Sequence, residues 1–325
     1  MGKQDDELRW YLNKDYIFAD LCNGVLYNGK KVIFPHNLAE VQKNYQESLQ
    51  DRRGRKSAPR RERDIARLLC REEGFVLIAI ENQGESHLCM PLRCLEYDVE
   101  DLLKQLRRMK RHYKKVGGLK PGIEYLSGIK VTDRFIPTIT LVLFHGTGKW
   151  TAATRLQELL DLTGTDETLR KFLMDYHLHV VELTMLDEMK FETGLRELIG
   201  MMKRRDSKKD MQIYCRENAE RFKNMDDDTY DLICTMLHIR TLNVQKEKCR
   251  DRQAGGINMC KAFDDWAKEE REKGEKRGEK RGERQAEKRF GTLIDRLMKD
   301  GRIDDVKKAA TCLSVRKRLY QEYKI

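Results

Sequence analysis

Zinc-ligand spacing is missing from this sequence, although nine of its 325 residues are cysteine. Cys89 and Cys94 are spaced C-x4-C, and no C-x-x-C pair, second pair or nearby histidine pair completes a zinc set. Cys22, Cys70 and Cys234 stand in apolar runs, which is typical of reduced cysteine in a protein core. The cysteine pattern therefore argues against a zinc module and predicts a reducing cytoplasm.

Three further absences narrow the range of functions. No apolar run approaches the roughly 20 residues that a membrane span needs, so no membrane partner is expected. The opening stretch MGKQDDELRW is polar, which predicts no secretory signal. The stretch HGTGKWT lacks the Walker spacing, because Leu143 stands where the pattern needs glycine and Trp150 follows Lys149. Nucleotide binding is therefore not expected.

Positive charge exceeds negative charge along the chain. Lysine and arginine number 65, aspartate and glutamate 54, and the net charge at pH 7 is +11. This balance favours a polyanionic partner, most simply nucleic acid, while the alternative is that the charge serves solubility alone. A basic loop over residues 51–63 and the end of a long helix that starts near residue 91 carry the clearest positive clusters. The helix cluster has a second explanation, since basic residues favour a helix C-terminus.

Hydrophobic spacing predicts a mixed α/β order in the first half of the chain. Residues 8–27 have helical spacing, and a further helix is expected over residues 37–47. Two short, almost purely apolar runs, residues 134–146 and 176–183, predict strands that are buried on both faces. The run between them, residues 151–162, suits a helix. We therefore expect a sheet with both hairpin and crossover connections.

The second half of the chain is predicted to be mainly helical. We divide the sequence into an α/β domain over residues 1–190, a helical region over 191–265, a charged glycine-spaced tract over 266–289 and a small helical domain over 290–325. Glu–Lys and Glu–Arg pairs in the tract favour helix and its glycines oppose it, so it is a marginal helix or a tether. The last segment has small apolar faces, which suggests packing on itself or on another copy, and we expect a dimer or larger homo-oligomer.

A hairpin with one carboxylate at each open end is predicted over residues 61–83, RERDIARLLCREEGFVLIAIENQ. A tight turn at Glu72–Glu73 pairs Cys70 with Phe75, and the same register places Asp64 directly opposite Glu81. Side chains opposite each other on neighbouring strands have Cβ atoms roughly 4.5–5.5 Å apart, and like charges in such a pair are unfavourable.

A divalent cation would neutralise this carboxylate pair. Mg²⁺ accepts one or two carboxylates, keeps several waters and takes its remaining ligands from substrate phosphates. Gln83 points to the same face as Glu81 and could orient a water or a phosphate oxygen, and the backbone carbonyl of Asn82 is a further candidate ligand. The alternative interpretation is that Asp64 is a loop residue and Glu81 a strand-end charge.

Together these motifs resemble the PD-(D/E)XK nuclease superfamily, and more closely the bacterial recombination-promoting nuclease/putative transposase family. The resemblance rests on Asp64, the strand LIAIENQ, the helix MPLRCLEYDVEDL, the run PTITLVLFHGTGKW and the C-terminal stretches NMCKAFDDW and MKDGRIDDVKKA. It implies a restriction-endonuclease-like fold, with a mixed β-sheet core flanked by helices in residues 1–190 and a mainly helical C-terminal half.

The resemblance also implies an activity: a Mg²⁺-dependent DNA endonuclease, with Mn²⁺ as a substitute ion, that acts in DNA recombination or mobility, or in defence against foreign DNA, in the bacterial cytoplasm. Asp64 and Glu81 would hold the metal and Gln83 would orient water. Gln83 departs from the superfamily pattern, which has lysine there, so the alternative is a DNA-binding or oligomerising relative that no longer cleaves. Asp15 and Asp20 are candidates for the superfamily's first-helix acid.

The same resemblance assigns DNA contacts to basic residues near the hairpin and on the long helix. Arg93 and Tyr97 match the family's helix and lie one helical turn apart, which suits either structural bonding or substrate contact. The predicted phosphate ligands are Arg60, Arg61, Arg63, Arg93, Arg107, Arg108, Lys110 and Arg111.

Overall fold

A five-stranded mixed sheet forms the centre of the first unit of the chain. The computed structural model describes all residues except 1, 42–62, 240–241, 243–245 and 252–254. The strands follow the order β1-β2-β3-β4-β5 across the sheet, with β1, β2 and β3 antiparallel and β3, β4 and β5 parallel. Their bounds are β1 Leu38–Glu40, β2 Ile65–Arg71, β3 Gly74–Gln83, β4 Thr138–Phe144 and β5 His179–Glu182.

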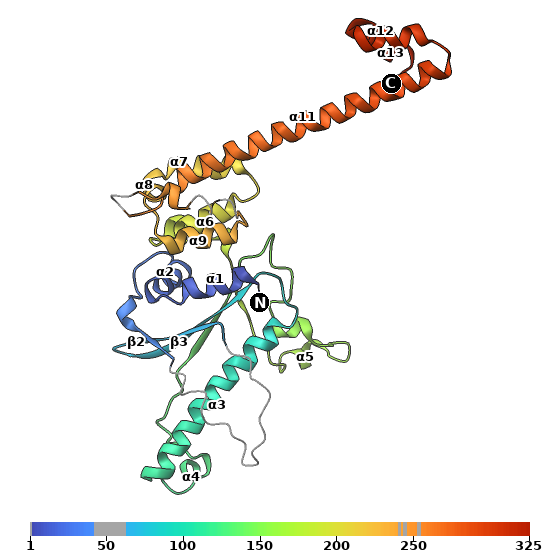
Figure 1. Cartoon of the computed structure of the whole chain (residues 1–325). Coiled ribbons are helices and arrows are strands. Elements are labelled where there is room, and N and C mark those ends of the chain that lie inside the picture. Colours follow the sequence, from blue (N-terminus) through green and yellow to red (C-terminus); the bar gives the residue numbers. More distant parts are fainter. Residues whose placement is uncertain (1, 42–62, 240–241, 243–245, 252–254) are drawn as a thin grey trace. The chain divides into compact units, whose positions relative to one another are not determined.

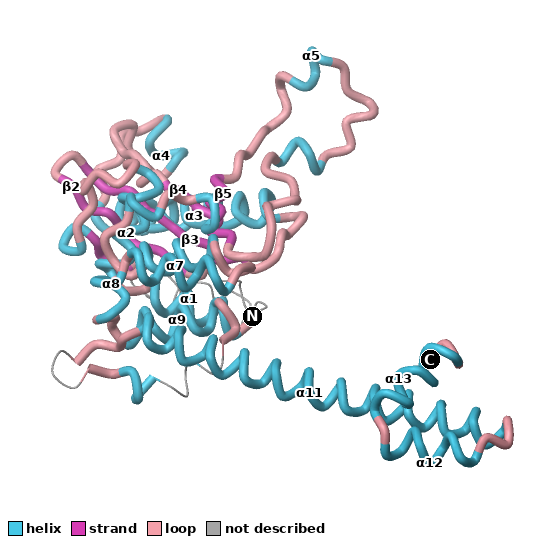
Figure 2. Tube along the Cα trace, turned by 90° about the horizontal axis from the view of Figure 1, so that it is seen from above, coloured by secondary structure: helices cyan, strands magenta, loops and turns pink. Residues whose placement is uncertain are grey.

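Helices cover both faces of this sheet, as Figures 1 and 2 show. On one face lie α1 and α2, and on the other α3 packs against β4, with Met90 and Cys94 around Val142. Pro91 stands in the first turn of α3, where its missing N–H leaves no bond unmade. The bounds are α1 Lys3–Leu12, α2 Asp15–Leu26, α3 Met90–Val116, α4 Ile123–Ser127 and α5 Glu167–Arg170.

A helical layer follows β5 and packs beside α1. The phenol of Tyr11 on α1 lies 2.8 Å from the hydroxyl of Thr229 on α9, and both side chains are buried. The bounds are α6 Leu195–Lys203, α7 Lys208–Glu217, α8 Ala219–Lys223 and α9 Asp227–Met236, with 3-10 turns at Pro35–Asn37, Leu156–Leu159, Leu183–Met185, Glu188–Lys190 and Lys246–Cys249. The α/β fold class and the helical C-terminal half predicted from the sequence are confirmed.

The second unit comprises residues 263–325 and has its own small core. Leu293, Leu297, Ala309 and Leu319 are buried together where α11, Met259–Lys299, meets α12, Ile303–Thr311, and α13, Leu313–Glu322. The glycine-spaced tract is part of the continuous α11 helix. The four predicted segments remain a prediction about domains, and the homo-oligomer remains a prediction as well.

Two local predictions were wrong. Leu38 pairs with Leu69 of β2 in an edge strand, where the sequence predicted the start of a helix over residues 37–47, and residues 42–47 of that range lie outside the described residues. The helix expected over residues 151–162 is a single 3-10 turn, because Leu156 N–H bonds to the carbonyl of Tyr176 at 2.9 Å and this extended pairing replaces helical bonds. Across the described residues, none of the helices combines the length and apolar character that crossing a bilayer requires.

Candidate active site

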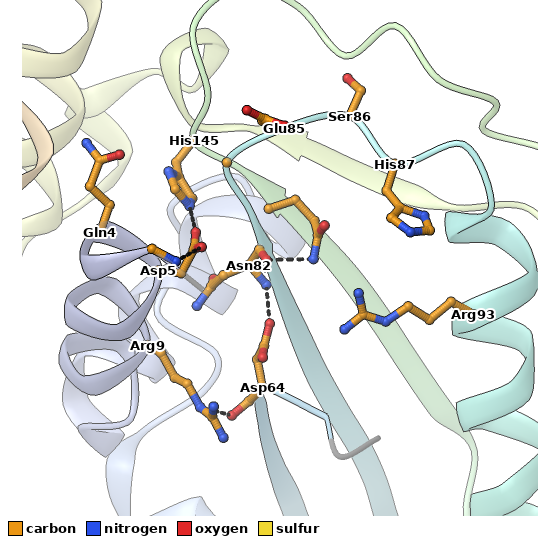
Figure 3. Close-up of a pocket in the computed structure, with 13 residues that line it drawn as sticks. Gln4, Asp5, Arg9, Asp64, Asn82, Glu85, Ser86, His87, Arg93 and His145 are labelled. Atoms are coloured by element: carbon orange, nitrogen blue, oxygen red, sulfur yellow. Dashed lines mark hydrogen bonds and ion pairs between the residues drawn. The ribbon is translucent and has the colours of Figure 1, made fainter. Parts of the chain in front are cut away.

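A pocket opens at the carboxyl ends of β3 and β4, between the starts of α1 and α3. Figure 3 shows its lining, which includes Asp5, Asp64, Gln83, Arg93 and His145. The position follows from topology, because neighbouring parallel strands end at the same edge of a sheet and ligands of open α/β folds bind there.

The hairpin has the predicted register. Cys70 pairs with Phe75, Ile65 pairs with Ile80, and Glu72–Glu73 form the two-residue turn. Gly74 then has φ of +147°, a backbone conformation that favours glycine. The two-residue turn fixes this register, since the turn type and the loop length of a hairpin set its strand pairing.

Asp64 directly precedes Ile65 and Glu81 directly follows its partner Ile80 at the open end of the hairpin, and the two carboxylates interact electrostatically. The backbone N–H of Asn82 donates to Asp64 Oδ2 at 2.9 Å, which holds the aspartate across the end of β3. Burial and then the charge of Asp64 raise the pKa of Glu81 to about 7. Burial also raises the pKa of Asp64, and Asp5 adds to that rise. A pair of carboxylates is therefore kept here at an electrostatic cost.

Glu81 is fully buried and is not among the residues that line the pocket. Its Oε2 accepts from Arg93 Nη2 at 3.3 Å, whereas Oε1 has no hydrogen-bond partner among the described residues. An unpartnered oxygen on a buried carboxylate is unfavourable unless a further group satisfies it. This oxygen is the clearest mark of a ligand position in the site.

The donor set suits a hard divalent cation held by few protein ligands. Within the described part of the chain, no group of three or more His, Cys, Asp or Glu side chains is arranged to share an ion. Mg²⁺ needs only one or two carboxylates from the protein, and Asp64 and Glu81 supply two oxygen donors of the preferred type. The residues present therefore fit a magnesium ion that keeps most of its waters.

Gln83 and Asn82 are bonded to each other. Gln83 Nε2 donates to the carbonyl of Asn82 at 2.7 Å, so this predicted ligand oxygen already accepts one bond. The side chain of Asn82 is buried, and neither its oxygen nor its nitrogen has a partner among the described residues. The sequence predicted the backbone carbonyl of Asn82 as a metal ligand, but gave no indication of its buried side-chain amide.

The carboxylate that α1 brings to the pocket is Asp5, which the sequence analysis did not single out. Asp5 Oδ1 lies 2.8 Å from Nε2 of His145, the residue that follows β4 (Figure 3). Burial lowers the pKa of His145, and Asp5 opposes this effect. The usable signal was the acidic start of an amphipathic helix, but only the packing of α1 against β3 brings that start to the site.

Asp15 and Asp20 lie on α2 and do not line the pocket. Asp15 Oδ1 accepts from Arg67 Nε at 2.8 Å. Asp20 Oδ2 accepts from the backbone N–H of Thr193 at 2.9 Å and from its hydroxyl at 2.6 Å, which ties α2 to the segment before α6. The structure therefore brings neither candidate to Asp64 and Glu81.

Arg63 does not have the exposure that the predicted DNA contact requires. Its guanidinium bonds to Asp98 at 2.6 Å and Asp101 at 3.0 Å on α3 and to the hydroxyl of Thr140 at 2.8 Å, with only 9% of the side chain exposed. It joins the entry of β2 to α3 and β4, and these bonds occupy the guanidinium that was predicted to contact DNA.

The other predicted DNA contacts fall into three groups. Arg93 lines the pocket, and its Nε donates to the phenol of Tyr97 at 3.1 Å. Arg60 and Arg61 lie outside the described residues. On the second half of α3 lie Arg107, Arg108, Lys110 and Arg111, the last three exposed and the first partly buried.

Comparison with known families gives one match. A family model described as putative transposase, YhgA-like, matches residues 67–231, which is about half of the chain and spans β2 to α9. The match begins three residues after Asp64 and includes Glu81 and Gln83. Neither the curated proteins nor the solved structures returned a match.

Proposed function

Because this chain belongs to the YhgA-like putative transposases, a branch of the PD-(D/E)XK nucleases, we propose that it is a Mg²⁺-dependent DNA endonuclease. The family supports a nuclease- or transposase-related role. The observation that carries the finer proposal is the buried carboxylate of Glu81, which has one unpartnered oxygen and a second carboxylate, Asp64, beside it. Such an activity would serve DNA recombination or mobility, or defence against foreign DNA.

Five residues at or beside the pocket have a chemical task in this proposal. Asp64 and Glu81 would hold the ion, which when bound would polarise the scissile phosphate and help to generate hydroxide from water. The amide of Gln83 would orient the attacking water. Arg93 carries the positive charge that Gln83 lacks and lies at the pocket wall, where it would stabilise negative charge that develops on the phosphate. Asp5, bonded to His145, would complete the acidic wall on the α1 side.

DNA is the proposed substrate because a basic cluster lies on the second half of α3, the helix whose first turns carry Arg93 at the pocket. Arg108, Lys110 and Arg111 are exposed, and phosphate contacts of this kind carry little sequence information. Binding should therefore weaken steeply as salt rises, with a slope of about 0.9 for each phosphate contact in a plot of log affinity against log salt concentration.

The direct test is cleavage of supercoiled plasmid by the full-length chain with Mg²⁺, with Mn²⁺ and with chelator. We expect cleavage with either ion and none with chelator. Asp64→Asn and Glu81→Gln should abolish it, whereas Glu73→Gln, the same chemical change at the exposed turn of the same hairpin, should cut like the parent. Equal cleavage by the two site variants and the parent would refute the assignment of the site.

A second candidate, a relative that binds DNA without cutting it, is favoured by one observation. Gln83 is neutral and its amide donates to the strand's own carbonyl, so the usual lysine charge of this motif is missing. Calorimetry with Mn²⁺ separates the two candidates. No heat of metal binding together with retained, salt-sensitive DNA binding would favour the second.

A further inference from the structure

The far end of α3 carries a protrusion, which we call the tip and define as residues 107–135. It consists of the last turns of α3, the short helix α4 and the loops around it. Figure 1 shows α4 beside the C-terminal end of α3. The pocket lies at the other end of that helix, where Arg93 lines it. Of the residues in the tip, the proposed function uses only the basic ones on α3. The loop and α4 have no role in it.

Two acidic residues build the tip from inside. Glu124 is buried, and its carboxylate accepts from the backbone N–H of Lys120 at 2.9 Å and of Val131 at 3.2 Å. These two bonds lower the pKa of Glu124. Asp133 accepts from the phenol of Tyr113 at 3.0 Å and from the backbone N–H of Lys130 at 2.8 Å. The loop therefore has a defined shape.

The charge that the tip presents outward is positive. Residues 107–135 contain nine lysines and arginines and two acidic residues, a net charge of +7. Both acidic residues are occupied by the internal bonds just described. Lys114, Lys115, Lys120 and Arg134 are exposed around the loop.

Large apolar side chains are exposed in the same segment of the chain. Leu126 is 84% exposed, Tyr125 75% and Ile123 70%, and all three belong to α4. Val116 at the end of α3 and Val131 are also exposed, and the backbone N–H of Val131 bonds to Glu124 of α4. Contiguous apolar exposure on an ordered support marks an interaction site, and a partner that also matches a charge of +7 must be anionic.

Duplex DNA satisfies both requirements. Its phosphates match the basic rim, and apolar and aromatic side chains can enter between base steps or stack on bases. The spacing favours DNA as well. Arg93 at the pocket and Val116 at the tip are separated by 23 residues of one continuous helix, about 34 Å at 1.5 Å per residue. One turn of B-DNA is also about 34 Å long.

We propose that the tip inserts Tyr125 and Leu126 into duplex DNA about one helical turn from the scissile phosphate. The inference rests on the proposed nuclease function, and α3 sets the spacing. A duplex that lies along α3 would present equivalent groove positions to the pocket and to the tip. Opening a base step there would anchor the DNA while the phosphates next to the cut are held at the pocket.

The test compares short and long duplexes bound by the full-length chain in chelator, where no cleavage is expected. We expect a duplex of about 30 base pairs, which reaches both the pocket and the tip, to bind at least 10-fold more tightly than a hairpin duplex of about six base pairs, which at roughly 20 Å is too short to span them. The double variant Tyr125→Ala/Leu126→Ser should lose this gain. Fluorescence of 2-aminopurine in the long duplex should rise with the parent, because the base unstacks, and not with the variant.

Controls separate this inference from the nuclease proposal. Phe172→Ala removes another aromatic side chain that is 84% exposed, outside the tip, and should behave like the parent. If the parent cuts plasmid but the double variant binds the long duplex as tightly and with equal fluorescence, the tip proposal alone is overturned. If the parent neither cuts nor binds duplex DNA, both proposals fail. Tip-dependent binding to phosphatidylserine vesicles without tip-dependent DNA binding would assign the tip to an anionic membrane instead.

Discussion

Arg93 Nη2 on α3 lies 3.3 Å from the fully buried Oε2 of Glu81 on β3. The arginine reaches the carboxylate from the pocket wall, so the glutamate has its countercharge on one side and an unpartnered oxygen on the other. Burial and Asp64 nevertheless hold the pKa of Glu81 near 7, which means that Arg93 compensates only part of the cost of this charge. The uncompensated part of this cost lowers the stability of the folded protein, so the carboxylate pair can be tested by unfolding measurements without any substrate.

Glu81→Gln should stabilise the metal-free protein at pH 8. The folded-state pKa of Glu81, about 7, lies above its ordinary value of 4.5, so the parent binds more protons when folded and loses stability as pH rises between these values. Removing the charge should add about 3 kcal/mol to the free energy of unfolding at pH 8, and the gain should vanish below pH 4.5. Urea denaturation in chelator at several pH values measures this, with Glu73→Gln as the matched control.

Substitution of Asp5 should lower the cleavage rate, whereas substitution of Asp20 should lower the stability of the protein. Asp5→Asn should reduce cleavage by about 10- to 100-fold, as expected for a group that supports metal ligands. Asp20→Asn should leave cleavage at the parent's level and lower stability by about 1–3 kcal/mol, because it weakens the bonds to Thr193. Cleavage rates and urea midpoints of both variants decide between α1 and α2 as the source of the third acid. The reverse pattern would return that role to Asp20.

Arg63→Met should damage the fold and spare DNA affinity. Without the guanidinium, Asp98 and Asp101 lose a shared partner in a largely buried position, which typically costs about 3–5 kcal/mol. Arg111→Met, on the exposed surface of α3, should do the opposite and reduce DNA affinity with little change in stability. Unfolding curves and fluorescence anisotropy on folded protein provide the two measurements. A loss of DNA affinity for Arg63→Met at unchanged stability would restore the prediction made from the sequence.

The hairpin could be predicted from the sequence because its evidence is local. Two apolar runs joined by a two-residue turn fix their own register, and the pairing of Cys70 with Phe75 follows. Asp5 could not be found in this way, since it reaches the pocket only through the packing of α1 at the end of the sheet. The burial of Arg63 could not be predicted for a related reason: its partners Asp98 and Asp101 are far away in the sequence, and charge composition does not reveal burial.

Helical spacing alone also has limits in this chain. The run around Leu156 has the spacing of a helix, yet its backbone pairs with Tyr176 in an extended conformation. Spacing correctly predicted α3, but Val99, Leu102 and Leu103 from its apolar stripe remain exposed. Which residues of a helix are buried depends on where the sheet packs against it. The spacing of apolar residues in α3 did not predict that packing.

Arg93 gives the sharpest test of how the pocket works with glutamine at position 83. Arg93 is proposed to stabilise the negative charge that develops on the phosphate during cleavage. In that case Arg93→Gln should lower kcat about 100-fold or more, with little change in KM for DNA. Arg93→Lys should recover part of the loss, because the charge remains while the bond to Tyr97 changes. Arg71→Gln, an exposed arginine beside the hairpin turn, is the matched control and should cut like the parent. A purely structural Arg93 would instead show equal losses for lysine and glutamine, in step with lowered stability in urea.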